Sequence, residues 1–541
     1  MNMSKHDQKI EEFDAVVVGA GFTGLYQLYK FRQLGLKVLV LEAGTGVGGT
    51  WYWNRYPGAR TDSESRVYQY WFSDELLEEW DWSERFPAQE ETERYLNYVA
   101  DKFDLKKDIQ FNSRVTAATY NEDSKRWTVT TENGNAVSCQ FFVMGAGGLS
   151  IPKTPDIPGV DDFKGTKVHT SRWPQGGIDL AGKRVGIIGT GATGIQVIQT
   201  IASEVGHLTV FQRTPNYAIP MNNPKFDDTE RRKMRAEYPE IREHVNKTFG
   251  GHFWDSDERP FFEVSKEERE RRLNELWEDG SLQFWVGSYS DLWLEEDVSK
   301  AFSKFVAEHI RARVNDPVVA EKLIPHDHEF GTRRVPLETH YFEAYNRENV
   351  TLIDVNEDPI DHVDATGIVT HSGHHDLDIL IFATGFDAGT GALTSVDIRG
   401  RDQRLLRDDW NKNGINNYLG LQVNGYPNMF MVMGPMSPAA AFCNVPTCIQ
   451  QQVDWITDCV SFVRNKGSHA IEPSQEAEAG WGRHHDEKAA ESLVTKPDSW
   501  YTGTNIEGKP RRLLAYIGGV PEYQAHCDQE RDSGFAHCVF Y

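Results

Sequence analysis

The 541-residue sequence is poor in cysteine, in long apolar stretches and in positive charge, and each shortage excludes a class of protein. Its six cysteines form no CxxC pair, and their irregular spacing predicts unpaired thiols in a chain kept reduced. No apolar run reaches the roughly 18 residues that a membrane-spanning helix needs. The polar segment 1–14 lacks the apolar core of a secretory signal. We therefore expect a cytoplasmic chain with no membrane partner.

Positive charge is in deficit, with 57 Lys and Arg against 81 Asp and Glu, which gives 57 − 81 = −24. Non-specific binding to nucleic acid depends on a basic surface, so no nucleic-acid partner is expected. Apolar residues at 39% and charged residues at 26% are typical of a folded globular protein. At roughly 150 residues per domain, the length predicts about three to four domains.

The sequence contains, twice, the glycine pattern GxGxxG between two apolar strands. In the first copy a strand over 13–18 leads into a glycine loop and a helix, and a second strand covers 37–41. A complete unit of this kind binds a dinucleotide. The first glycine allows a tight turn, the second lets the backbone approach a pyrophosphate, and the third lets the helix pack on the strand. The motif residues are Gly19, Gly21, Thr23, Gly24 and Glu42.

The second copy has strands over 184–188 and 208–211. Its glycine loop begins 189 − 19 = 170 positions after the first, which is too far for a solenoid repeat. We interpret the two copies as separate dinucleotide-binding units. The cofactor contacts expected from the second loop are Gly189, Thr190, Gly191, Ala192, Thr193, Gly194 and Gln196.

The residue that ends the second strand differs in charge between the two copies. A carboxylate such as Glu42 accepts both ribose hydroxyls of an adenosine that lacks a 2′-phosphate, whereas Arg213 is suited to pair with a 2′-phosphate. The first unit is therefore expected to hold FAD or NAD, and the second NADP. The alternative interpretation is that Arg213 is a solvated charge at a strand end.

The predicted fold class is α/β, with two Rossmann-like dinucleotide-binding domains and a helical insertion. The insertion is charged and helical in period, and Ser265 with Glu268 predicts a capping box. Strand-like runs over 377–387 and 425–435 return the chain to the sheets. We expect a FAD-binding domain over 10–145 and 380–541, an NADP-binding domain over 150–222 and 331–379, and a helical subdomain over 223–330.

Three further motifs resemble those of the type I Baeyer–Villiger monooxygenases. The segment Phe163–Pro174, FKGTKVHTSRWP, matches the family fingerprint FxGxxxHTxxWP. The segment Gly48–Asp62, GGTWYWNRYPGARTD, matches the family's second signature, and Gly331–Arg347 is similar to the segment that carries its catalytic arginine. The resemblance spans about residues 13 to 515.

Other flavoproteins with twin dinucleotide units are the alternatives. The flavin-containing monooxygenases that oxidise amines and sulfides have a similar fingerprint without the Thr-x-x-Trp-Pro ending. Disulfide reductases need a CxxC or CxxxxC pair near the flavin, which we do not expect here. A non-catalytic NADP(H)-sensing flavoprotein is the third alternative, and the presence of both Asp62 and Arg334 argues against it.

The resemblance implies an oxidoreductase that uses FAD, NADPH and O2. The reaction it implies converts ketones, cyclic or aryl-aliphatic, to lactones or esters through a C4a-peroxyflavin. The organic chemistry belongs to the cofactor, while the protein supplies position and charge. We expect the chain to work as a monomer on a small-molecule ketone.

Arg334 and Asp62 are the catalytic residues that the resemblance implies. An arginine stays protonated and presents a planar fork beside developing negative charge, and a nearby carboxylate orients it. The alternative for Arg334 is a solvated surface pair with Arg333. The alternative for Asp62 is a helix N-cap before residues 63–70.

The resemblance also implies the cofactor contacts outside the glycine loops. His169 and Trp173 lie in the fingerprint, and we expect them to couple the domains rather than to transfer protons. The loop after Gly434 is expected to line the substrate pocket, with room at Ala439, Ala440 and Ala441, and no metal site is expected. The remaining cofactor contacts are Thr50, Trp51, Tyr52, Trp53, Arg60, Thr61, Asp62, Tyr68, Val115 and Val445, with Thr214, Arg333, Arg334 and Trp500 on the NADP side.

Overall fold

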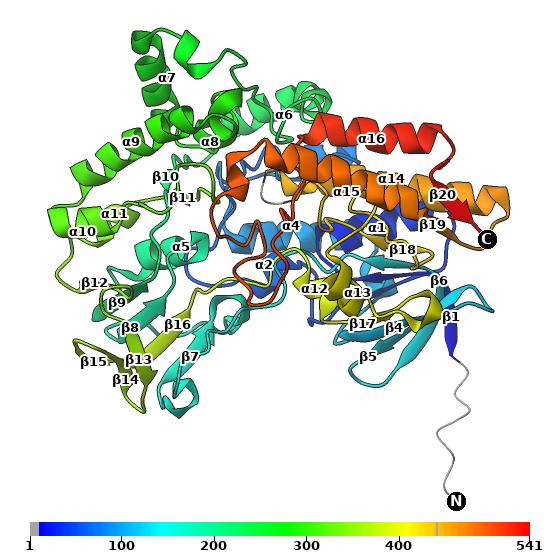
Figure 1. Ribbon diagram of the computed structural model, residues 1–541, viewed down its shortest axis with the longest axis horizontal. Coiled ribbons are helices and arrows are strands. Elements are labelled where there is room, and N and C mark those ends of the chain that lie inside the picture. The colour runs from blue at the N-terminus through cyan, green and yellow to red at the C-terminus, as the bar shows by residue number, and fades with distance from the viewer. Residues whose placement is uncertain (1–9, 440–441) are drawn as a thin grey trace, which may run out of the picture.

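The computed structural model describes residues 10–439 and 442–541. Each of its two largest sheets contains the strands of one glycine-motif unit (Figure 1). The expectation of room at Ala440 and Ala441 lies outside the described residues. None of the helices in the described part of the chain is long and apolar enough to cross a membrane.

The first sheet has eight strands in the order β17-β4-β5-β6-β1-β2-β3, and β18 also pairs with β6. The apolar strand β1 is central and runs parallel to β2 and β6, so the carboxyl ends of all three meet at one edge. The strands are β1 (Glu11–Val18), β2 (Val38–Leu41), β3 (Ile109–Gln110), β4 (Val115–Asn121), β5 (Arg126–Thr131), β6 (Ala136–Met144), β17 (Asp397–Arg399) and β18 (Met429–Met431).

The second sheet is parallel throughout, in the order β12-β9-β8-β16-β7. Its strands are β7 (Thr166–His169), β8 (Arg184–Ile188), β9 (His207–Gln212), β12 (Val350–Asp354) and β16 (Ile379–Phe382). The domain boundary that we expected at residue 380 falls inside β16. All four residues of β16 are buried between β8 and β7. This strand therefore belongs entirely to the second sheet, which the chain leaves only after Phe382.

Long helices cover the first sheet. The helix α1 (Phe22–Gln33) packs on α14 (Val445–Lys466), where the Tyr26 hydroxyl donates to Asp454 at 2.8 Å. The helices α14, α15 (Gln475–Ala490) and α16 (Val520–Asp532) lie together on the C-terminal side of the molecule (Figure 1). The corresponding helix of the second sheet, α5 (Ala192–Ile201), follows the second glycine loop.

The insertion is helical. Most of its buried aromatic residues join the core of the second sheet, whereas Tyr238 of its first helix joins the core of the first sheet. Its helices are α6 (Asp228–His244), α7 (Lys266–Asp279), α8 (Gln283–Val286), α9 (Glu296–Arg313) and α10 (Pro317–Lys322). The predicted capping box at Ser265 is only half formed. Ser265 accepts from the Glu268 amide, but the Glu268 carboxylate binds Arg259 at 2.9 Å instead. The complete capping box is at the start of α6, where Asp227 and Glu230 each bind the other's backbone amide.

Shorter elements connect these parts. The short helices are α2 (Thr50–Trp53), α3 (Asp74–Glu79), α11 (Tyr341–Ala344), α12 (Gly391–Thr394) and α13 (Leu406–Asn413), and the longer α4 covers Gln89–Lys102. The small sheets are built from β10 (Ile219–Pro220), β11 (Leu337–Glu338), β13 (Ile360–Val363), β14 (Gly367–Thr370), β15 (Gly373–Asp376), β19 (Ile471–Pro473) and β20 (Cys538–Phe540).

Candidate active site

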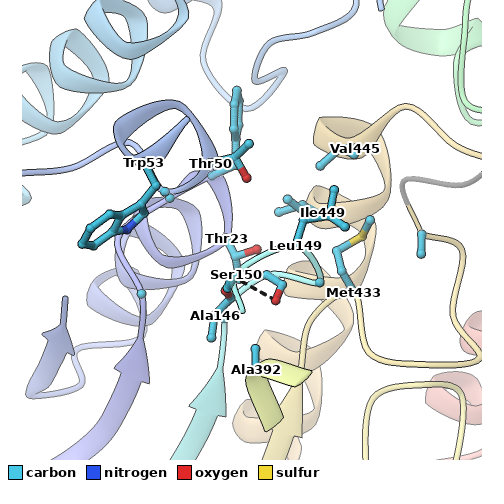
Figure 2. Close-up of a pocket in the computed structure, with 18 of the residues that line it drawn as sticks. Thr23, Thr50, Trp53, Ala146, Leu149, Ser150, Ala392, Met433, Val445 and Ile449 are labelled. Carbon is cyan, nitrogen blue, oxygen red and sulfur yellow. Dashed lines mark hydrogen bonds between the residues drawn. The ribbon is translucent and has the colours of Figure 1, made fainter. Parts of the chain in front are cut away.

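The carboxyl edge of the first sheet opens into a cavity of about 500 Å³. Figure 2 shows that Thr23 of the first glycine loop, Thr50 and Trp53 of α2, and Val445 and Ile449 of α14 surround one space. Segments far apart in the sequence therefore form one binding site, as is usual at the carboxyl ends of parallel strands.

The first glycine loop has the close packing that a dinucleotide cradle needs. Gly19 has φ of +94°, and a Cβ on Gly24 would lie only 1.8 Å from the carbonyl oxygen of Gly19. A Cβ on Gly21 would approach Gly49 at 3.2 Å on the cavity wall. The first turn of α1 carries no acidic side chain and no side-chain cap. Its backbone amides can therefore donate hydrogen bonds to a bound anion. These residues fit the pyrophosphate of FAD.

Glu42 is fixed at the cavity wall where the adenosine ribose is expected. Its two carboxylate oxygens accept the backbone amides of Ala20 at 2.7 Å and Gly44 at 2.6 Å. Burial raises the pKa of Glu42, and these amide donors oppose that rise. Each oxygen keeps a second lone pair, which is what two ribose hydroxyls require.

Most of the residues expected to contact FAD do line the cavity, and three do not. The Tyr52 hydroxyl accepts from Thr45 and Gln175, and its ring lies beneath the loop at Gly44, so Tyr52 supports the wall from behind. Arg60 and Gly24 are the other two residues that do not line the cavity. The Arg60 guanidinium donates to the carbonyl oxygen of Phe86, and Gly24 packs against the turn that follows β1. The expected residues that line the cavity are Gly19, Gly21, Thr23, Glu42, Thr50, Trp51, Trp53, Thr61, Asp62, Tyr68, Val115, Val445, Arg334 and Trp500.

Asp62 and Arg334 form an ion pair on the cavity wall across 272 positions of sequence. The Arg334 guanidinium donates to Asp62 Oδ2 at 2.9 Å, and the two side chains are 21% and 12% exposed. Arg334 also lies over the ring of Trp285 in α8, 5.4 Å from its centroid. Neither residue is a solvated surface group, and residues 63–70 contain no helix for Asp62 to cap.

Three other polar groups near Arg334 are uncharged at neutral pH. Burial, with a smaller effect of the Arg334 charge, lowers the pKa of His252 to about 3, so this imidazole is uncharged at neutral pH. Burial raises the pKa of the Tyr68 and Tyr501 hydroxyls well above the ordinary value. The Asp62–Arg334 ion pair therefore lies among neighbours that carry no charge. The second Asp62 oxygen, Oδ1, is buried without a hydrogen-bond partner among the described residues and is available to a ligand.

The second glycine loop repeats the packing of the first. A Cβ on Gly194 would meet the Gly189 carbonyl oxygen at 2.2 Å, whereas a Cβ on Gly191 would meet nothing within 4 Å. The first turn of α5 again has no acidic residue. Thr190 is fixed by donating to the carbonyl of Thr214 at 2.9 Å, and Gln196 bridges to the first domain by donating to the carbonyl of Arg60 at 3.2 Å. This loop fits the pyrophosphate of NADP.

Three cations gather beyond the end of β9. Burial, and then the charge of Arg213, lower the pKa of Lys153. The pKa of Arg333 is also lowered, chiefly by burial, with Arg213 contributing against the opposing effect of Asp327, its partner at 3.0 Å. Mutual repulsion of this kind favours an anion between the cations. Sequence reasoning missed Lys153, because it lies in a linker without a motif.

The segment around Trp500 closes one side of the cavity. Trp500 packs on Tyr501 with ring centroids 4.4 Å apart. Asn505 donates to the carbonyl of Phe386 at 2.8 Å, and Lys509 pairs with Asp387 at 2.6 Å, which fixes the segment to the chain that follows β16.

His169 and Trp173 of the fingerprint lie outside the cavity lining. His169 Nδ1 accepts from the Ser171 amide at 3.1 Å, and Trp173 is buried in the core of the second domain. His169 thus ends the edge strand β7 of the second sheet, and their coupling of the two domains stays a prediction.

Several cavity residues had no signal in the sequence. They belong to the loop after β6, to the helical insertion and to the region around α14, and they come together only in the folded chain. They are Ala146, Leu149, Ser150, His252, Leu282, Val286, Met433 and Ile449. Phe442, in the loop after Gly434, and Tyr501, next to Trp500, also line the cavity and lie in segments that the sequence did single out. The one usable hint was the sequence GAGG at 145–148, because a glycine-rich turn after a third parallel strand reaches the same sheet edge.

The expectation that all cysteines are unpaired is wrong. Cys443 and Cys448, which have the CxxxxC spacing, form a disulfide at the start of α14, and Cys443 lines the cavity. The other four cysteines are free. The argument that no such spacing exists therefore cannot exclude a disulfide reductase, and the family assignment has to rest on other observations.

Comparison with known proteins provides those observations. A family model described as pyridine nucleotide-disulphide oxidoreductase matches residues 16–250. The acetone monooxygenase (methyl acetate-forming) of Gordonia sp. (strain TY-5) is 49% identical over 94% of this chain and 96% of its own. A Baeyer–Villiger monooxygenase of Pseudooceanicola batsensis is 40% identical over 100% of this chain and 98% of its own. The chain belongs to the Baeyer–Villiger monooxygenase family.

Solved structures agree with this assignment. The crystal structure of the OTEMO complex with FAD and NADP superimposes with a TM-score of 0.94 at 43% identity, covering 98% of this chain and 100% of that one. The predictions of family, of an α/β fold with two dinucleotide domains, and of FAD and NADP(H) as cofactors are confirmed. This Baeyer–Villiger monooxygenase is an oxidoreductase, and the alternative of an amine or sulfide oxygenase is not favoured.

The two glycines of the second loop provide a matched pair of variants. Gly194→Ala should lower the free energy of unfolding by about 1–3 kcal/mol, since its Cβ would overlap a backbone carbonyl. Gly191→Ala should leave stability within about 0.5 kcal/mol but weaken NADP binding, since its Cβ faces open space where a pyrophosphate approaches. Thermal unfolding and NADP titration distinguish the two effects. Unchanged NADP affinity in Gly191→Ala would contradict the placement of the phosphates.

Proposed function

We propose that this enzyme converts small ketones to esters or lactones, with Arg334 as the catalytic residue and Asp62 as the residue that positions it. The observation that carries the proposal is the Asp62–Arg334 ion pair on the wall of the cavity that fits FAD. When bound, FAD supplies the activation of oxygen and NADPH supplies the hydride.

Arg334 acts through a fixed positive charge. Oxygen insertion into a ketone passes through negatively charged oxygen, and a preorganised cation stabilises such charge without reorganising. The ion pair with Asp62 and the ring of Trp285 hold the guanidinium from two sides.

The size of the substrate is limited by the cavity. FAD has to occupy most of the space, and bulky side chains form the wall that faces the insertion and the C-terminal segments. These are Leu282, Val286, Phe442, Trp500 and Tyr501. The relative named for acetone supports a small ketone. The neutral His252 adds a polar group that can hydrogen-bond without carrying charge.

For NADP we propose that Arg213, Arg333 and Lys153 hold the 2′-phosphate together with Thr214, and that Trp500 lies beside the nicotinamide. The charge of Arg213 contributes to lowering the pKa of both Lys153 and Arg333, as expected for cations that converge on one anion. The glycine loop before α5 would hold the pyrophosphate.

A substrate panel tests the proposed specificity. The FAD-loaded enzyme is supplied with NADPH and with acetone, butanone, cyclopentanone, cyclohexanone or phenylacetone, and the products are measured by mass spectrometry. We expect kcat/KM to be highest for the small ketones and to fall by at least about tenfold for phenylacetone, whose ring exceeds the space left beside FAD. A preference for phenylacetone would contradict the size limit. Preferential oxidation of an amine or a sulfide, included in the same panel, would contradict the ketone assignment.

We further propose that the chain is monomeric and cytoplasmic. Four of its six cysteines are free, and three of these are buried, as in proteins kept reduced. Sedimentation of the FAD-loaded protein at micromolar concentration checks the monomer, and a dimer mass would contradict it.

A further inference from the structure

Two histidines and a glutamate meet between α15 and α16. His484 lies on α15, and Glu522 and His526 lie one turn apart on α16, which brings their side chains to one face of that helix. The candidate ligand atoms of the three residues all lie within 4.8 Å of one another, and each residue is partly buried. None of the three lines the active-site cavity.

The separation of His484 and Glu522 matches the distance between neighbouring ligands of a bound metal. His484 Nε2 lies 3.3 Å from a carboxylate oxygen of Glu522. In a tetrahedral zinc site with bonds of about 2.0–2.1 Å, neighbouring ligand atoms are about 3.3 Å apart. The ring of His526 meets that of His484 edge to face, with centroids 4.7 Å apart, and its candidate ligand atom lies within 4.8 Å of the other two.

The surrounding residues orient and charge this cluster as a metal site requires. The Tyr516 hydroxyl donates to Glu522 Oε1 at 2.8 Å and lies 2.8 Å from His484 Nε2, so that nitrogen has to exchange Tyr516 for the metal. Lys488 lies 3.0 Å from Glu522 Oε2. Carboxylate ligands of metals are commonly held by such outer hydrogen bonds.

His526 has no competing partner. Its ring makes no hydrogen bond to any residue that the structure describes and is in contact only with the rings of Trp481 and His484.

We propose that His484, Glu522 and His526 form a zinc site that fastens the C-terminal helix α16 to α15. Two imidazoles and one carboxylate are a ligand set that zinc accepts, and water completes the four-coordinate site. Tyr516 and Lys488 act as the outer shell. This inference departs from our expectation that the chain has no metal site.

Calorimetric titration of the FAD-loaded enzyme with Zn²⁺ at about pH 7.5 tests the proposal. We expect one site per chain, and at least tenfold weaker binding in His484→Ala, His526→Ala and Glu522→Gln. Tyr516→Phe should weaken binding by about 10–100-fold through loss of the outer hydrogen bond. The control is His362→Ala, because His362 is also a partly exposed histidine paired with a carboxylate but lies in β13. It should bind zinc as the parent does.

A thermal measurement separates binding from misfolding. Zinc should raise the unfolding midpoint of the parent enzyme and of His362→Ala, but not of His526→Ala, whose midpoint without metal should equal that of the parent. The absence of a binding heat in the parent would overturn the proposal. Equal zinc affinity in the parent and in the three ligand variants would also overturn it, because the metal would then bind elsewhere.

Discussion

Arg334→Ala is expected to lower ester formation by about 100- to 1,000-fold while the protein still binds FAD. Removal of one preorganised donor beside a developing oxyanion typically costs about 2.7–4 kcal/mol of transition-state stabilisation. Arg334 contacts Asp62 and Trp285 rather than the glycine cradle, so the cofactor site should persist. The yield of ester from acetone and the visible spectrum of the bound flavin measure the two effects separately.

Three further variants define the role of Arg334. Arg334→Lys keeps the charge but loses the planar fork, so its rate should lie between those of the parent and Arg334→Ala. Asp62→Asn keeps the size of Asp62 but removes the ion pair, and a smaller loss is expected because Arg334 remains. Arg311→Ala is the surface control, since that side chain is 47% exposed and pairs with Glu321. Full ester formation by Arg334→Ala would remove Arg334 from the mechanism.

Arg213→Ala is expected to raise the KM for NADPH by about 10- to 100-fold and to leave the KM for NADH nearly unchanged. A hydrogen bond to a charged group contributes about 1.5–3 kcal/mol, and only NADPH carries the 2′-phosphate that receives it. Lys153 and Arg333 remain near the phosphate, so binding should weaken rather than disappear. Steady-state kinetics with both coenzymes provide the ratio.

The neighbouring cations and one remote arginine complete that test. Arg333→Ala and Lys153→Ala should shift the NADPH to NADH ratio in the same direction, while Arg259→Ala, 56% exposed beside Asp257 in the helical insertion, should not. Equal effects of Arg213→Ala on the two coenzymes would contradict the assignment of the 2′-phosphate to this cluster.

The sequence was most informative where local rules govern structure. The strand at 184–188 was predicted to the residue, because a short apolar run before a glycine loop has few alternatives. The glycine positions follow from contacts that any side chain at Gly24 or Gly194 would block. The strand-like run expected over 377–387 contains a strand, but β16 covers only Ile379–Phe382, because only these residues pair with β7 and β8.

The substrate side of the cavity could not be predicted in the same way. His252 and Val286 lie in segments without a motif, and only the folding of the insertion against α14 and the C-terminal loop brings them to Arg334. The Cys443–Cys448 pair was overlooked although its spacing was visible. Tyr52 illustrates the reverse error, because a motif position was assigned to the cofactor while its side chain supports the loop behind the wall.

The central claim is that this enzyme inserts one atom of O2 into a ketone. The most direct test is to incubate the FAD-loaded enzyme with NADPH and acetone under ¹⁸O2 and to analyse the methyl acetate by mass spectrometry. The account predicts one ¹⁸O atom per ester molecule and one ester molecule per NADPH consumed. Consumption of NADPH with hydrogen peroxide as the only product, or an ester without ¹⁸O, would contradict it.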